Sequence, residues 1–198
     1  MIFNEKIKEN LEMFLNEKNR FFSLLDGACT ERTGYQDFRK WLLYSDFIAA
    51  PASIKYHDSE VGGLLHHSIK VYDELCRLCK IYEYDFDIDP QEKIVSALLH
   101  DICKIYTYTI EKAWRKDDNN KWEQYDRYKF EEKFPYGSHG GKSVYLIQRY
   151  MPLSENEAVA INCHMGAWDG NTNVSSVYEK YPLAWLLHVA DEKATFLP

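Results

Sequence analysis

The sequence has no long apolar run and no excess of positive charge. None of its hydrophobic stretches approaches the roughly 20 residues that a membrane-spanning helix needs. Its 24 Lys and Arg residues are outnumbered by 31 Asp and Glu residues, which gives a formal net charge of −7. Because proteins that bind long nucleic acids carry basic surface stripes, we expect neither a membrane nor a long nucleic acid as a partner. The first residues also lack the basic and then apolar layout of a signal peptide, so we expect a cytoplasmic location.

Cysteine is scarce, and its number is odd. Five cysteines in 198 residues are typical of reduced thiols and not of a disulfide framework. Cys76 and Cys79 have the Cys-x-x-Cys spacing of a zinc knuckle, but no second cysteine pair accompanies them, which favours two packed thiols. The length fits one domain, and 45% hydrophobic residues are enough for a sizeable core.

Apolar residues recur at helical spacing along most of the chain, with charged residues on the opposite faces. This periodicity predicts helices over residues 4–26, 34–47, 64–82, 90–101, 139–150 and from 182 onward. A capping box at Ser154–Glu157 predicts the start of one more helix, and Asp89 followed by Pro90 marks another helix start. Residues 166–180 contain Gly, Asn and Ser and are predicted to form a long loop.

Residues 106–130 break the helical rhythm. Tyr106, Tyr108 and Ile110 alternate with threonines, and the Asp-Asp-Asn-Asn cluster at 117–120 is typical of a turn. We therefore predict a β-hairpin inserted into an all-α protein. Its many aromatic residues suit either a lid over a site or an element that packs on the domain, and the sequence leaves both readings open.

A histidine and an aspartate stand side by side at the end of an apolar run. The run ends in His100 and Asp101, and Lys104 follows three residues later. A carboxylate that enters an apolar environment needs a partner, because an unpaired buried charge is costly. A divalent metal is one such partner, and imidazole with carboxylate is a common set of ligands for it.

Further candidate ligands lie on the inward faces or at the ends of other predicted helices. His67 falls on the apolar stripe of the 64–82 helix, whereas His66 falls on its charged face and should meet water. His139 lies beside glycines at a helix start, and His164 lies near a helix end. Asp191 shares the apolar stripe of the last helix, where its carboxylate needs a cation or strong hydrogen bonds.

Six inward polar residues thus form one candidate constellation. They are His67, His100, Asp101, His139, His164 and Asp191. Four neutral imidazoles and two carboxylates suit one or two divalent transition metals, such as Mn, Fe, Ni, Co or Zn. Two metals roughly 3.5–4 Å apart can clamp an attacking hydroxide and a phosphoryl oxygen, and Asp101 is the expected bridge between them.

The order of these residues resembles the HD-domain superfamily of metal-dependent phosphohydrolases. The matching segments are Gly62–Ser68, Leu98–Lys104, Tyr136–His139, His164–Gly166 and Leu187–Asp191. The chain is similar to the HD domain of bacterial 3′–5′ exoribonucleases and to small stand-alone HD hydrolases of bacteria and their phages. The resemblance implies an all-α HD helical bundle with a hairpin inserted at about 106–130. It also implies a single HD domain over 1–198, with a helical extension at 1–48 and the metal-binding core at 49–198.

The resemblance assigns expected roles to single residues. His67, His100, Asp101 and Asp191 would be the core metal ligands, and His139 and His164 would hold a second metal. Lys104 matches a lysine that contacts phosphate, and His57 matches a histidine near the substrate. Asp101, Lys104 and His57 are therefore the expected catalytic residues. Lys55 and Lys142 are further candidates for positive charge around the substrate.

This chain departs from the pattern of its relatives at three points. Cys103 replaces the usual glycine, and Met165 stands where some relatives have a second histidine. The nuclease relatives carry a separate nucleic-acid-binding domain that is not evident in these residues, which favours a small substrate.

The expected function is the hydrolysis of a nucleotide, or of another small phosphoester or phosphoanhydride, by a metal-activated water. Two alternatives remain open at this stage: an HD-fold di-iron oxygenase, and a non-catalytic ligand-binding domain in which the metal only joins the helices. The sequence does not identify the substrate, the metal or the oligomeric state.

Overall fold

A computed structural model describes residues 2–54, 58–169 and 173–197 of the chain. Lys55 and His57 lie outside these described residues. The described part contains the following helices, turns and strands: α1 (Ile2–Cys29), α2 (Tyr35–Tyr44), α3 (Gly63–Ile81), α4 (Pro90–Leu99), the 3₁₀ turn η1 (Ile102–Lys104), β1 (Tyr108–Lys116), β2 (Trp122–Phe130), α5 (His139–Gln148), α6 (Glu155–Cys163), the 3₁₀ turn η2 (Gly166–Asp169), α7 (Val174–Lys180) and α8 (Pro182–Phe196). The predicted helical fold with an inserted hairpin is confirmed. Within the described ranges, every helix is too short or too polar to cross a membrane.

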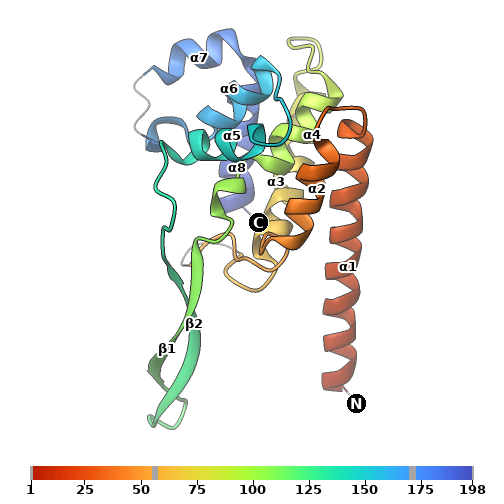
Figure 1. The fold of residues 1–198 in the computed structure, drawn as a ribbon. Helices are drawn as coiled ribbons and strands as arrows, with labels where there is room; N and C mark the ends of the chain where they lie inside the picture. The colour runs from red at the N-terminus through yellow and green to blue at the C-terminus, as the bar shows by residue number, and fades with distance from the viewer. Residues whose placement is uncertain (1, 55–57, 170–172, 198) are drawn as a thin grey trace.

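Four helices form the centre of the molecule. α3 packs on both α4 and α8, and α6 packs on the same two helices. α1 lies along α3 and α4 on one side, and α5 packs on α6 and on η1 (Figure 1). The hairpin leaves this helical body after η1 and projects away from it, so that its outer part stands clear of the helices (Figure 1).

The helix starts follow from local capping chemistry. The Asp89 carboxylate accepts hydrogen bonds from the backbone N–H groups of Gln91 and Glu92, and Pro90 occupies the first helical position of α4. Ser154 and Glu157 form the predicted capping box at the start of α6. Each start lies within a residue of its prediction, because the capping groups and their partners are close together in the sequence.

The prediction of an uninterrupted loop over 166–180 is wrong. The structure has η2 and the short helix α7 in this segment. The sequence of α7, with Ser and β-branched residues, gives only a weak local preference for helix. Val177 and Tyr178 instead pack against the core between α3, α6 and α8, and the Tyr178 hydroxyl donates to the Cys163 carbonyl. Tertiary packing thus decides the conformation here.

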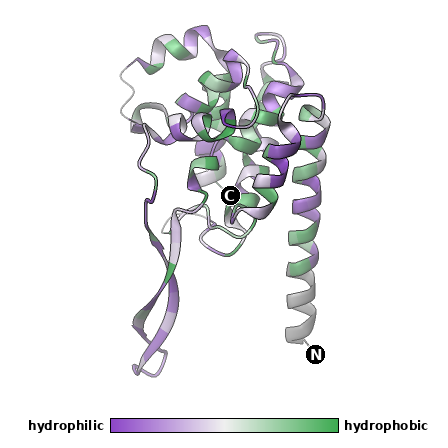
Figure 2. Cartoon of the chain, in the orientation of Figure 1, coloured by the Kyte–Doolittle hydropathy of each residue, from purple (hydrophilic) through white to green (hydrophobic). Residues whose placement is uncertain are grey.

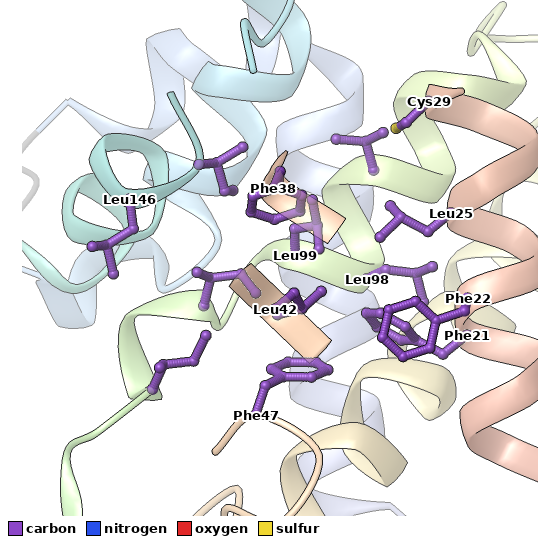
Figure 3. Close-up of a cluster of buried hydrophobic side chains, with 14 of the residues drawn as sticks. Phe21, Phe22, Leu25, Cys29, Phe38, Leu42, Phe47, Leu98, Leu99 and Leu146 are labelled. Atoms are coloured by element: carbon purple, nitrogen blue, oxygen red, sulfur yellow. The ribbon is translucent and has the colours of Figure 1, made fainter. Parts of the chain in front are cut away.

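The larger hydrophobic core joins the N-terminal helices to the central helices. Phe21 and Leu25 of α1, Phe38 of α2, and Leu98 and Leu99 of α4 are all buried in one cluster (Figure 3). Figure 2 shows hydrophobic residues gathered where the helices meet, whereas most of the hairpin is hydrophilic. The predicted division of the domain near residue 48 stays a prediction, and this core contains residues from both sides of it.

The root of the hairpin is bonded to the helical body through the backbone of Tyr106 and is closed by a hydrogen bond between its own two ends. The Tyr106 N–H donates to both oxygens of Asp46, at 2.9 and 3.1 Å. The backbone of Tyr106 has a φ of 60°, a value that residues other than glycine rarely adopt. The Glu131 N–H donates to the Thr107 carbonyl at 2.8 Å. Because an isolated two-stranded hairpin is only marginally stable in water, these bonds help to set the direction of β1 and β2.

A buried ion pair connects the turn after α1 to α6, and its loss should destabilise the fold. Arg32 donates to both oxygens of Glu157, at 2.7 and 2.6 Å, and the Glu157 side chain is fully buried. Arg32→Ala should lower the free energy of unfolding by about 3–5 kcal/mol, because it leaves a buried carboxylate without its cation. Urea unfolding followed by circular dichroism measures the change.

Arg20→Ala is the matched control for this prediction. Arg20 pairs with Asp73 at the surface, where 46% and 39% of the two side chains are exposed. Its loss should cost about 0–1 kcal/mol, because water screens the pair. Equal effects of the two substitutions would contradict the structural role of Arg32.

Candidate metal centre

The fold brings all six predicted ligands to one place. They come from α3, from the ends of α4 and α6, from the start of α5, and from α8. Three overlapping groups form, and within each the ligand atoms lie within 4.8 Å of one another. The groups are His67, His100 and Asp101; His100, His164 and Asp191; and Asp101, His139 and His164.

Two of the histidines are held in the same way at the ends of helices. His100 follows the last residue of α4, and its Nδ1 donates to the Ala97 carbonyl at 2.8 Å. His164 follows the last residue of α6, and its Nδ1 donates to the Ile161 carbonyl at 2.7 Å. A carbonyl can only accept, so Nδ1 carries a proton in both rings, and Nε2 has the free lone pair whenever the ring is neutral. Each ring thus satisfies a free helix-end carbonyl and presents Nε2 to the cluster.

His67 enters the cluster from the inward face of α3. Only 1% of it is exposed, and its Nε2 lies 3.0 Å from Oδ1 of Asp191, which is itself largely buried in α8. The neighbouring His66 points outward, and its Nδ1 bonds to Glu17 at 2.6 Å. The prediction that helical phase separates the two histidines is confirmed, as is the burial of Asp191.

Asp101 lies between the histidines and divides its two oxygens among them. Oδ2 lies 3.4 Å from His100 Nε2, 3.7 Å from His67 Nε2 and 2.6 Å from Lys104 Nζ. Oδ1 lies 2.7 Å from His139 Nε2 and 3.7 Å from His164 Nε2. The carboxylate therefore faces two different sets of imidazoles with its two oxygens.

The electrostatics of the centre favour the metal-binding protonation state at four of its groups and oppose it at two of its histidines, His100 and His139. Burial lowers the pKa of His67 and of His164, which keeps both rings neutral near pH 7. Burial alone would raise the pKa of Asp101, but the Lys104 ammonium and the His100 ring hold it well below its usual range. Burial lowers the pKa of Lys104, and the Asp101 carboxylate reverses this and raises it above its usual value. Burial would lower the pKa of His100 and of His139, but Asp101, joined at His139 by Cys103, reverses this and raises the pKa of both rings. Since imidazoles bind metals in the neutral form, metal binding at these two rings would release protons.

His139 is positioned by the first turn of α5. Asp169 of η2 accepts hydrogen bonds from the backbone N–H groups of His139 and Gly140, at 3.0 and 3.2 Å. A Cβ at Gly140 would lie 2.4 Å from the Ile161 carbonyl oxygen, so only glycine lets α5 come this close to the end of α6. This close approach brings the His139 ring to within 5.4 Å of the His164 ring, measured between centroids.

Residues that the sequence did not single out as site residues also contact the centre. Cys103 Sγ lies 3.3 Å from His139 Nε2, and Asp58 Oδ2 lies 3.8 Å from His67 Nδ1. His188 Nδ1 donates to the His164 carbonyl at 2.7 Å. The adjacency of Cys103 to the His-Asp pair could have suggested it. For the others, the sequence carries no local signal of the contact, because it depends on segments that meet only in the fold.

A pocket of about 400 Å³ opens beside the centre. His139, Cys103 and Lys104 line its inner end, and the root of the hairpin lines its outer part. Its volume lies within the range of small-molecule sites. A larger hollow of about 610 Å³ lies beyond Tyr136, and its lining includes none of the six candidate ligands. The smaller pocket is therefore the one that can present a ligand to the cluster.

Lys142 contributes no free charge to this pocket. Its Nζ donates to both oxygens of Glu132 at 2.8 Å, and only 5% of the residue is exposed. The sequence suggests that Lys142 supplies positive charge to the substrate, but in the structure Glu132 neutralises this charge. Lys104 differs, because its hydrogen-bond partner is a member of the cluster itself.

The residues present fit a divalent metal. Nε2 of His100 and Nε2 of His164 are buried and have no hydrogen-bond partner among the described residues. Buried ring nitrogens without a partner are costly unless they receive one. Both nitrogens face oxygens of Asp101, at 3.4 and 3.7 Å, without a hydrogen bond to them, so a cation shared by nitrogen and oxygen would satisfy both kinds of group.

Comparison with known proteins identifies the family. The family model of the HD domain matches residues 64–195, well over half of the chain. The chain therefore belongs to the HD domain family, which confirms the resemblance that the sequence indicates.

One curated relative is the dihydroneopterin 2′,3′-cyclic phosphate phosphodiesterase of Methanocaldococcus jannaschii. It is 36% identical to this chain over 81 residues, which are 40% of the chain and 30% of that protein. The match thus spans less than a third of the relative's length. No solved structure gives a significant match.

Divalent metal should stabilise the folded protein through this cluster. A ligand at 100 times its dissociation constant that binds only the folded state adds about 2.7 kcal/mol, or roughly 5–10 °C in Tm for a chain of this size. Thermal melts with Mn²⁺, Ni²⁺, Co²⁺ or Zn²⁺ should show this rise for at least one metal, and a chelator should reverse it.

His67→Ala should lose most of the rise in Tm, whereas His66→Ala should keep it. The two residues are neighbours in α3, and only His67 faces the cluster. An equal rise in both variants would place the metal elsewhere.

Proposed function

We propose that this protein is a metal-dependent phosphohydrolase that acts on a small phosphoester or phosphoanhydride, such as a nucleotide. The observation that carries the proposal is the cluster of four imidazoles and two carboxylates that shares Asp101 with Lys104 and borders an open pocket. Membership of the HD domain family supports it. A relative that is named as a phosphodiesterase of a cyclic phosphate supports the same reaction class.

The proposed ligands fall into two sets joined by Asp101. His67 and His100 lie on the Oδ2 side of Asp101, and His139 and His164 lie on its Oδ1 side. Asp191 lies beside His67 and His100 and also groups with His164. This division supports one or two divalent transition metals, with Asp101 as the bridging ligand when two are bound. Mn, Fe, Ni, Co and Zn all accept such a set of ligands.

A metal bound in this cluster would supply a water of lowered pKa and would polarise a phosphoryl oxygen. The side chains of the chain itself place the substrate. Lys104 keeps its positive charge beside Asp101 and has further N–H donors for a phosphoryl oxygen, so it would hold the phosphate against the cluster and stabilise charge that develops in the reaction. His57 stays a proposed contact of the substrate, because it precedes Asp58, whose carboxylate lies beside His67.

The helix-end hydrogen bonds would fix the ligands before any substrate arrives. The carbonyls of Ala97 and Ile161 hold the rings of His100 and His164 in one tautomer and one orientation. Partners of this kind orient ligands in metal sites, and their loss weakens metal binding. The geometry needed for catalysis would therefore be largely preformed.

Purified protein supplied with Mn²⁺, Ni²⁺, Co²⁺ or Mg²⁺ should hydrolyse bis(p-nitrophenyl) phosphate or members of a nucleotide panel. Asp101→Asn should abolish turnover, because it removes the negative charge that all four proposed histidine ligands face. Lys104→Met should lower kcat by about 100-fold, the size of effect seen when one charge-stabilising donor is lost. Lys121→Met, at the exposed hairpin turn, is the matched control and should retain full activity.

Metal content measured on the same samples separates the proposed function from its two alternatives. Full metal occupancy without turnover of any phosphoester would contradict the proposal. Stoichiometric iron together with oxygen consumption would favour the oxygenase, and a metal with every coordination position filled by protein would favour a purely structural role.

A further inference from the structure

The pocket beside the metal centre has two chemically different ends. Lys104 and His139, which both contact Asp101 of the cluster, line its buried inner end, where Lys104 carries a positive charge. Tyr108 lies near Lys104, and the more exposed rings of Phe130 and Tyr136 line the outer end. A ligand that fits both ends carries a phosphate at one end and a flat apolar group at the other.

We infer that this pocket selects phosphate esters of planar heterocycles, with the ring held against Phe130 and Tyr108 at the root of the hairpin. The inference rests on the proposed phosphohydrolase function and makes the two hairpin residues its specificity determinants. The phosphate would lie at Lys104 and the metal centre, and the heterocycle would lie toward the hairpin.

Charge neutralisation in the pocket directs the phosphate to its inner end. Lys142 and Glu132 also line the pocket, but they are bound to each other through two 2.8 Å hydrogen bonds. Their charges cancel, so the outer part offers no net charge to an anion. Among the described residues of the lining, the lysine that remains for a phosphate is Lys104, whose partner Asp101 belongs to the cluster.

The aromatic residues of the outer end have surface left for a ligand. Phe130 contacts Tyr108 edge to face, with ring centroids 6.1 Å apart, and 53% of Phe130 is exposed. Tyr136 is stacked on Tyr145 at 4.1 Å between centroids and still exposes 44% of its surface. Large aromatic rings with this much free surface beside a pocket are suited to stacking on a flat ring.

The hairpin root is a rigid wall for such a ring. Two residues tie it to the body: the Tyr106 N–H donates to Asp46, and the Tyr108 hydroxyl donates to the Ala52 carbonyl at 3.3 Å. The Glu131 N–H, which donates to the Thr107 carbonyl, closes the root itself. Because Tyr108 is bonded to the segment before α3 and pairs with Phe130 across the hairpin, these two residues are held in place. The sequence leaves two roles open for the hairpin, a lid or a packing element. The inference adds a third role, in which the root of the hairpin is a fixed wall of the pocket.

Adenosine 5′-monophosphate and ribose 5-phosphate are matched probes for this inference, because they share the ribose phosphate and differ in the heterocycle. In isothermal titration calorimetry of the metal-loaded wild-type protein, the Kd for adenosine 5′-monophosphate should be lower than the Kd for ribose 5-phosphate by about tenfold or more. Ring stacking supplies a difference in binding of this size. Phe130→Ala and Phe130→Leu should bring the two Kd values within about threefold of each other. Phe130→Trp, which keeps a flat ring, should retain the preference.

Trp122→Ala is the matched control. Trp122 lies on the same face of the hairpin as Phe130, at its outer end, and is 65% exposed, but it does not line the pocket. Its replacement should leave the preference for adenosine 5′-monophosphate intact. Melting curves of all variants check that each one folds.

Equal binding of the two probes by the wild-type protein, or a preference that survives Phe130→Ala, would overturn the inference. The proposed function is tested separately by hydrolysis of bis(p-nitrophenyl) phosphate. A protein that hydrolyses this ester without preferring adenosine 5′-monophosphate contradicts only the heterocycle pocket. A protein that prefers adenosine 5′-monophosphate and hydrolyses no phosphoester contradicts only the proposed function.

Discussion

The carboxylate of Asp101 is the point at which the separate parts of this protein meet. It lies directly after α4, and its oxygens face histidines from α3, α5 and α6 as well as Lys104 of η1. So many polar groups can be buried together only because they interact with one another, which offsets the cost of removing them from water. The hydrophobic core around Leu98 and Leu99 fixes the end of α4 and thereby fixes this carboxylate.

Much of the site could be predicted because its signals are local or periodic. Helical phase separates His67 from His66, since one turn of apolar neighbours is enough to define the inward face. The caps at Asp89 and Ser154 are equally local and set the starts of α4 and α6. The order of the ligands along the chain then carries the family resemblance, which the match over 64–195 confirms.

The remaining parts depend on contacts between distant segments, and sequence patterns do not encode these directly. Asp169 caps α5 from 30 residues away, and Lys142 is neutralised by Glu132 across the end of the hairpin. The helix α7 forms because Val177 and Tyr178 find a core to pack against. In each case the residue that makes the contact becomes a neighbour only after the chain has folded. Local sequence preference therefore does not predict the contacts of Asp169 and Lys142, and it predicts a loop where α7 forms.

The placement of His100 and His164 at the carboxyl ends of α4 and α6 has a further electrostatic consequence. Aligned peptide dipoles leave a partial negative charge of about half an elementary charge at the carboxyl end of a helix. Two such ends converge on the cluster, from helices that pack on each other. The backbone itself therefore creates a negative potential at this point, which attracts a cation before any side chain forms a bond to it. Substitutions that fray the last turn of either helix would weaken this attraction even where all six side chains are retained.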